Sequence, residues 1–97
     1  MNIGVCKISL RIPENQSLKG KRHVVRSVTE RVRNKFNVAI AEVDSGDKWQ
    51  IATLGICYVS NDGRHANEVM SHIVDYITTS RLDVEVLDCE IELVSVF

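Results

Sequence analysis

The chain has 97 residues, which is enough for one domain with an ordinary hydrophobic core and too few for a second independent domain. Apolar residues make up 44% of the chain and charged residues 26%, which excludes the compositions of disordered and fibrous proteins. The formal net charge is −1. We therefore expect residues 1–97 to form a single ordinary domain.

The first twelve residues, MNIGVCKISLRI, predict a strand that is buried on one side. Polar residues alternate there with the apolar residues Cys6, Ile8, Leu10 and Ile12. Pro13 ends the pattern. Lys7 and Arg11 interrupt the apolar run, so the segment lacks the uninterrupted centre of a signal peptide and the length of a membrane span. We therefore expect a cytoplasmic protein with no membrane contact.

Residues 17–36, SLKGKRHVVRSVTERVRNKF, predict a helix of about five turns. Ser17 suits the N-cap position. The apolar side chains recur at helical spacing, at Leu18, Val25, Val28, Val32 and Phe36. This segment carries seven Lys or Arg and one Glu, a net charge of +6, whereas residues 37–97 carry three bases and eleven acids, a net charge of −8. Such asymmetry is a hint about partners.

Two segments rich in β-branched and aromatic residues, 37–44 and 49–60, predict a hairpin in which Gly46 suits the tight turn. The second strand is apolar on both sides, with Ile51, Cys57 and Val59 on one and Ala52, Leu54, Ile56 and Tyr58 on the other. A sheet face that is open to water should carry polar residues at alternate positions. We therefore predict a homodimer that covers this face. The alternative, that a few small apolar residues simply face water, stays open.

A second helix is predicted from about residue 63 to Ser80, with Asp62 able to cap it. Its apolar residues form one stripe: Ala66, Val69, Met70, Ile73, Val74 and Ile77. In the last strand the apolar positions are Leu87, Cys89, Ile91 and Leu93. Val84 and Val86 have the opposite phase, which predicts a bulge or bend near Val86.

The predicted order β-α-β-β-α-β indicates an α+β fold. Two right-handed βαβ units split in this way give the ferredoxin-like sandwich, a four-stranded antiparallel sheet with two helices on one face. The three cysteines, Cys6, Cys57 and Cys89, form no CxxC pair and are odd in number, so we interpret them as buried thiols.

Four bases of the first predicted helix fall within about 60° of arc, beside the apolar stripe. We call Lys19, Arg22, Arg26 and Arg33 the basic ridge. Its ends are about 21 Å apart at about 1.5 Å per residue, which is long enough to follow several phosphates. Arg31 and Lys35 lie at the other border. Lys21 is nearer the stripe, and we place it with the ridge as a nucleic-acid contact.

A charged face is also what any surface helix shows, because Lys and Arg are good helix formers. That reading does not explain why one acid accompanies seven bases, since like charges at i,i+4 destabilise a helix by a few tenths of a kcal/mol. An anionic partner would relieve this repulsion. So would Asp88, Glu90 and Glu92 of the last strand, from the same chain or a neighbouring one. No strand carries the aromatic pattern with which related folds stack RNA bases, so we expect contacts to phosphates.

Four stretches, SLKGKR, FNVAIAEVD, DKWQIATLG and VSND, resemble the YlxP-like family of small bacterial proteins of unassigned biochemical activity. The resemblance runs over nearly the whole chain. It implies a ferredoxin-like fold and a gene neighbourhood of translation-initiation and ribosome-maturation factors, including ribosome-binding factor A. The motif covers Ser17, Leu18, Lys19, Lys21, Arg22, Ala41 to Asp44, Trp49 and Gln50. Gly20 stands where the family usually has Asp or another polar residue, so we expect a weaker helix start.

No pattern in the chain predicts an active site, a metal or a cofactor. His65 and His72 are about 10 Å apart along one helix, too far to share a metal through their own turns. His23 has no Cys or Asp at ligand spacing. Glu42 and Asp44 are typical of exposed residues or salt-bridge partners. The loop RIPENQS lacks the glycines of an acylphosphatase phosphate loop, so that enzyme is disfavoured.

Two hypotheses follow from the sequence. The first is a non-catalytic, dimeric module that associates with ribosomal RNA or a ribosome-assembly complex through the basic helix. The second is a homodimeric protein-interaction module that binds no nucleic acid. It would use the apolar sheet face and Trp49, the only tryptophan. Trp49 is either packed in the core or in a dimer interface, or it is an exposed anchor for a protein partner.

Overall fold

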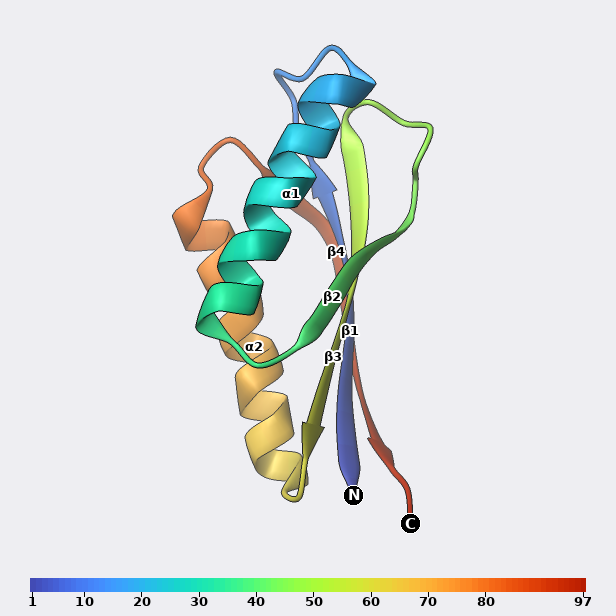
Figure 1. Cartoon of the computed structure of the whole chain (residues 1–97), viewed down its shortest axis with the longest axis vertical. Coiled ribbons are helices and arrows are strands. Elements are labelled where there is room, and N and C mark those ends of the chain that lie inside the picture. Colours follow the sequence, from blue (N-terminus) through green and yellow to red (C-terminus); the bar gives the residue numbers. More distant parts are fainter.

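The computed structural model describes all residues 1–97 and has the predicted ferredoxin-like fold. Its elements are β1 (Asn2–Arg11), α1 (Leu18–Lys35), β2 (Ala39–Asp44), β3 (Ile51–Ser60), α2 (Gly63–Ser80) and β4 (Glu85–Ser95). The four strands form one antiparallel sheet in the order β2-β3-β1-β4. Both helices cover the same face of the sheet, and both termini lie at one end of the molecule (Figure 1). No helix is both long enough and apolar enough to span a membrane.

The core lies between the helices and one face of the sheet. Even-numbered residues of β1 and β3 point into it, as the pairs Cys6 with Ile56 and Ile8 with Leu54 show. The buried stripe of α1 and the predicted stripe of α2 close the other side. The largest fully buried apolar side chains are Cys6, Ile8, Leu10, Val32, Leu54, Ile56, Met70, Ile73 and Ile77.

Both helices begin where the sequence predicts. The side-chain oxygen of Ser17 accepts a hydrogen bond from the backbone N–H of Gly20 at 3.0 Å, and that of Asp62 accepts one from the N–H of Arg64 at 3.0 Å. Each bond satisfies one N–H group that the helix itself leaves without a partner. Ser17 and Asp62 are therefore confirmed as N-caps.

The strands depart from perfect register at two places. Ser9 pairs with Asp88 and Leu10 with Val86, so Leu87 is an extra residue in β4, which confirms the predicted irregularity near Val86. A second bulge, which the sequence pattern did not predict, makes Val43 the extra residue of β2. In the β2–β3 turn the left-handed residue is Ser45, with φ of 63°, and not Gly46.

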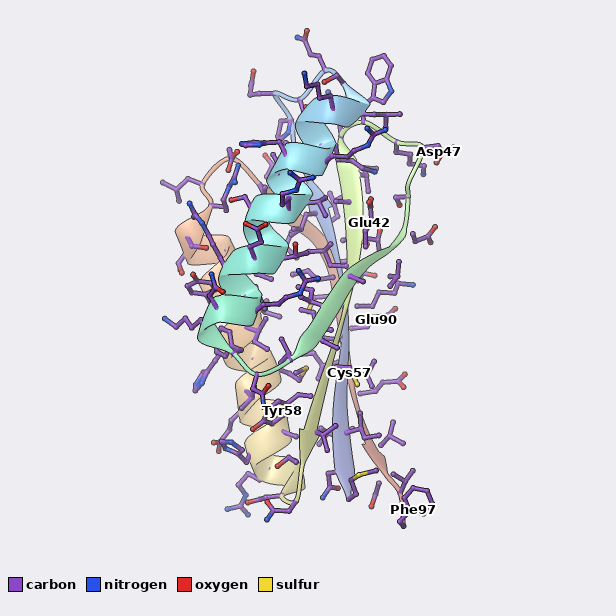
Figure 2. All side chains as sticks on the ribbon, in the orientation of Figure 1. Glu42, Asp47, Cys57, Tyr58, Glu90 and Phe97 are labelled. Atoms are coloured by element: carbon purple, nitrogen blue, oxygen red, sulfur yellow. The ribbon has the colours of Figure 1, made fainter.

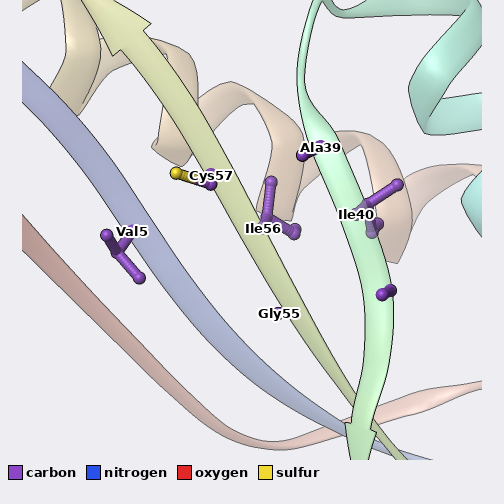
Figure 3. A pocket seen from close by; sticks show the side chains of 7 residues that line it. Val5, Ala39, Ile40, Gly55, Ile56 and Cys57 are labelled. Carbon is purple, nitrogen blue, oxygen red and sulfur yellow. The ribbon is translucent and has the colours of Figure 1, made fainter.

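The open face of the sheet has two different halves. Across β1, β3 and β2 the apolar residues Val5, Cys57 and Ala39 lie opposite one another. They line a hollow of about 310 Å³ above Gly55 (Figure 3). On the other side of β1 lie the β4 acids Asp88, Glu90 and Glu92; Figure 2 shows Glu90 pointing away from the helices and Tyr58 lying on their side. The prediction that β3 is apolar on both faces is therefore confirmed; what packs on the open face stays a prediction.

Candidate nucleic-acid interface

Three residues of the basic ridge, Lys19, Arg22 and Arg26, are exposed and form no ion pair. Each lies roughly 100° or more around α1 from its buried centre, because successive residues are 100° apart. The only acid in α1, Glu30, is in none of the three ion pairs of the chain either. No carboxylate of the protein therefore neutralises these three side chains, and they are available to an external anion.

Lys21 is not part of this exposed surface. Its side chain is 2% exposed, and its ammonium group lies 2.9 Å from the Glu42 carboxylate. The same ammonium donates hydrogen bonds to the carbonyl oxygens of Ser45 at 2.6 Å and Ile51 at 3.1 Å. All three of its donors are therefore used inside the protein. The prediction that Lys21 contacts nucleic acid is wrong, because no phosphate can reach this nitrogen.

Arg33, at the C-terminal end of the ridge, is partly occupied by the sheet. One of its guanidinium nitrogens donates a hydrogen bond to the carbonyl oxygen of Ile40 at 2.8 Å. Ile40 belongs to the edge strand β2, so this bond fixes the last turn of α1 to the sheet. Arginine has five N–H donors, so Arg33 keeps some for an anion but is less free than Arg22 or Arg26.

The two bases at the other border of α1 point toward α2. Arg31 donates to the carbonyl oxygen of Ser80 at 3.4 Å, and the Lys35 ammonium lies 4.7 Å above the ring of Tyr76. Such cation–π contacts are worth about 0.5–1 kcal/mol at exposed sites. The border residues therefore help to dock the helices, and the ridge on the β2 side is the free part of the basic surface.

Trp49 lies in the β2–β3 loop, and the residue is 55% exposed. Packing of Trp49 in the core of this chain is therefore excluded, while packing between two chains and an exposed anchor for a protein partner stay predictions. Asn15 fixes this loop to the start of α1, since its side-chain amide donates to the carbonyl oxygens of both Ser17 and Trp49. The side chain of Gln50 donates back to the carbonyl oxygens of Pro13 and Asn15 at 3.2 Å each. An exposed indole is thus held by a fixed backbone beside the N-terminal end of the ridge.

The position of Asn15 explains why residue 20 is a glycine. A Cβ atom on Gly20 would overlap the side-chain oxygen of Asn15 in the position that this side chain occupies. The absence of a side chain lets Asn15 lie over the first turn of α1 and reach Trp49. The family-motif residues at the start of α1, at the end of β2 and in the β2–β3 loop therefore meet at one end of the molecule, the upper end in Figure 1, whereas the VSND stretch lies at the other end.

The two acids of β2 have different surroundings. Glu42 points toward α1 and pairs with Lys21, whereas the Asp44 carboxylate accepts a hydrogen bond from the backbone N–H of Ser45 at 2.8 Å. The bulge at Val43 causes this difference, because it moves Asp44 into register with Thr53 on the open face. The pair therefore does not converge as a general acid and base would.

The remaining titratable groups do not gather into a site. A hydrogen bond from Arg81 lowers the pKa of the Asp83 carboxyl, while burial raises the pKa of the Cys6 thiol to about 12. Cys6 lies 4.0 Å from Cys89, sulfur to sulfur. Cys89 itself is exposed and Cys57 is half-buried, so the prediction of three buried thiols is correct only for Cys6. His23, His65 and His72 are exposed on the two helices.

Comparison with known proteins places the chain in a family. Residues 3–91 match the family described as "Protein of unknown function (DUF503)". The chain is 35% identical over 75 residues to the uncharacterized protein YlxP of Bacillus subtilis (strain 168), covering 77% of this chain and 82% of that protein. A de novo designed protein with ferredoxin fold, solved by NMR, matches with a TM-score of 0.49 and 14% identity, covering 97% of this chain and 84% of that chain. The resemblance to YlxP is confirmed, and the chain belongs to the DUF503 family.

Proposed function

We propose that this protein is a non-catalytic module that associates with ribosomal RNA or a ribosome-assembly complex through the exposed side of α1. The observation that carries the proposal is the set of three unpaired cations, Lys19, Arg22 and Arg26, on one ridge of a rigid helix. The gene neighbourhood implied by the YlxP-like resemblance supports a ribosomal RNA as the polyanion. In this role Arg33 contributes less than the other three residues, because the sheet already holds it.

The physical basis is the repulsion that α1 carries when it is alone. Lys21 is neutralised by Glu42, but the other six bases and one acid of this segment still raise the free energy of the free protein, and phosphates placed along the ridge lower it again. Binding also releases counterions from the nucleic acid, which is a favourable term at low salt. The overall charge of −1 adds no long-range attraction, so the contact depends on this local surface.

A salt titration of RNA binding tests the proposal. With three phosphates neutralised on a single strand, log affinity should fall with log salt at a slope of about −2, from roughly −0.7 per phosphate. The double substitution Arg22→Glu and Arg26→Glu should abolish binding while the far-ultraviolet circular dichroism stays unchanged. Arg64→Glu is the control, because Arg64 is an exposed base of α2 outside the ridge. Unchanged binding in the double variant would reject the ridge.

A second candidate function rests on the apolar half of the open face. Val5, Val43 and Val59 are among its exposed side chains, and no element of the chain covers them. We propose that a second copy packs on this half in a two-fold arrangement. If the two-fold axis passes through β2 and β3, the dimer buries the same apolar residues on both chains and keeps the acidic β4 strands apart. Like charges then do not meet in the interface.

The mass of the protein in solution tests this candidate. Light scattering during gel filtration should give a dimer of about twice 10.9 kDa for the wild type and a monomer for Val59→Lys. Lysine at this exposed position buries no charge in the monomer, so the fold should be retained. A wild type that is monomeric at high concentration would contradict the proposal.

A further inference from the structure

We propose that Trp49 is a stacking platform for an unpaired base of a single-stranded RNA whose phosphates follow the basic ridge. The inference rests on the proposed RNA function and names the substrate class for it. The observation that supports the inference is that Trp49 is exposed, has its backbone fixed by Asn15, and lies at the end of the ridge where Lys19 and Arg22 are. An aromatic platform next to a line of cations is the arrangement by which proteins bind single strands.

The position of Trp49 follows from bonds in three directions. The loop from Ser45 to Ile51 is fixed to α1 at both of its ends by the ammonium group of Lys21. Asn15 fixes the carbonyl of Trp49 to the N-cap turn. Arg22 follows Lys21 directly in the helix, so it projects about 100° around the axis, on the exposed side. The loop that carries the indole and the first ridge residues are therefore neighbours in space.

The surroundings of the indole favour a base over an apolar protein surface. A second, shallow hollow lies at Trp49 and is also lined by Asp47, Lys48, Gln50 and Ile51. Ile51 is therefore the only apolar neighbour of the ring in this hollow. Figure 2 shows Asp47 at the outer part of this loop. A protein anchor lies at the centre of a patch that excludes water, and this loop offers no such patch. A nucleobase is planar and polar at its edge, so it stacks on one indole and leaves the charged neighbours hydrated.

Anchoring also reduces the cost of binding. The backbone carbonyl of Trp49 is already fixed in the free protein, and that of Ser45 accepts from Lys21. Stacking then orders only the indole torsions and not the loop. In a fully paired RNA duplex the bases are stacked on one another and cannot stack on this ring, so the proposal predicts a preference for single strands.

The only tryptophan of the chain gives a direct readout, since stacking on a base quenches indole fluorescence. The full chain is titrated at low salt with oligouridylate, with a duplex RNA and with inorganic polyphosphate, which has charge but no bases. We expect all three to bind the ridge and oligouridylate alone to quench Trp49. Trp49→Ala should weaken oligouridylate binding by about 5- to 150-fold and leave polyphosphate binding unchanged. Trp49→Phe should keep most of the affinity, measured with labelled RNA.

Leu82→Ala is the matched control, because Leu82 is an exposed apolar side chain in the α2–β4 loop. Equal binding of oligouridylate and polyphosphate without quenching would overturn the stacking proposal and leave the ridge intact. Loss of all binding in the wild type would remove the proposed function itself. If Trp49→Ala weakened association with ribosomal particles but not with oligouridylate, the indole would be a protein anchor and the stacking proposal would again be wrong.

Discussion

The ammonium nitrogen of Lys21 lies 2.9 Å from a carboxylate oxygen of Glu42, with the lysine side chain 2% exposed and the glutamate side chain 28% exposed. This pair joins α1 to the edge strand β2, and the two further bonds of the ammonium reach the β2–β3 loop. A buried ammonium group is tolerated only when its donors are satisfied, which is the case here. The pair therefore positions the loop that carries Trp49 relative to the ridge.

Lys21→Ala should destabilise the domain by about 3 kcal/mol, because it leaves the Glu42 carboxylate and two carbonyl oxygens without their donor. The total free energy of unfolding of such a domain is about 5–15 kcal/mol, so the loss is large. Urea unfolding followed by circular dichroism measures it. Lys21→Met combined with Glu42→Leu should recover the part of the loss that comes from the unpaired carboxylate, while the carbonyl oxygens of Ser45 and Ile51 stay without this donor. Arg11→Ala breaks only an exposed pair with Glu85, and should change stability by less than about 1 kcal/mol.

Within the ridge, Arg26→Ala and Arg33→Ala should separate RNA contact from structure. Arg26 is unpaired, so its removal should reduce the salt slope of RNA binding by about 0.7 and leave the unfolding midpoint unchanged. Arg33 donates to Ile40 on β2, so its removal should lower the unfolding midpoint and reduce the salt slope by less. Equal slopes for the two variants would contradict this difference. Both quantities come from the same purified variants.

The cysteines should differ in reactivity. Burial raises the pKa of Cys6 to about 12, so at pH 8 its thiolate fraction is negligible and iodoacetamide should leave it unmodified. Cys89 is exposed and should be alkylated in the native protein, and all three cysteines should react in urea. Peptide mass spectrometry identifies the sites.

The raised pKa of Cys6 also affects stability at high pH. This thiol contributes stability that is complete below the pKa of an unfolded cysteine, about 8.5, and is lost as the pH rises toward 12. Cys6→Ala should remove this part of the alkaline decrease in the unfolding midpoint.

For the alkylation experiment, rapid modification of Cys6 in the native state would contradict its burial.

The acid side of the stability profile should depend in part on Asp83. The hydrogen bond from Arg81 holds the pKa of this carboxyl below its usual range. Because its pKa is lowered, the ionised Asp83 carboxylate contributes its full share of folding stability above about pH 4, the ordinary pKa of an aspartate. This contribution is lost as the pH falls through the lowered pKa. Asp83→Asn should therefore flatten the decrease in melting temperature below pH 4. An NMR titration of Asp83 with an ordinary pKa would disprove the assignment.

The type and order of the elements follow from the sequence alone. Alternation in residues 6–12, the stripe from Ala66 to Ile77 and the caps Ser17 and Asp62 are local patterns, and the backbone obeys them because each element must bury its own apolar side. The phase change near Val86 is equally local, and it marks the bulge at Leu87. The bulge at Val43 gave no such signal, because Ala41 and Val43 alternate with the acids Glu42 and Asp44 without a change of phase.

The sequence also determined that α1 is basic and that four of its seven bases line one side, because charge and helical spacing are properties of the chain itself. Which of those bases are free was decided only by the tertiary structure. Glu42 reaches Lys21, Ile40 takes a hydrogen bond from Arg33, and Asn15 brings Trp49 to the start of α1. The reason is that the energy of a charge depends on what lies within a few ångströms in space, and the partners here come from other elements of the fold.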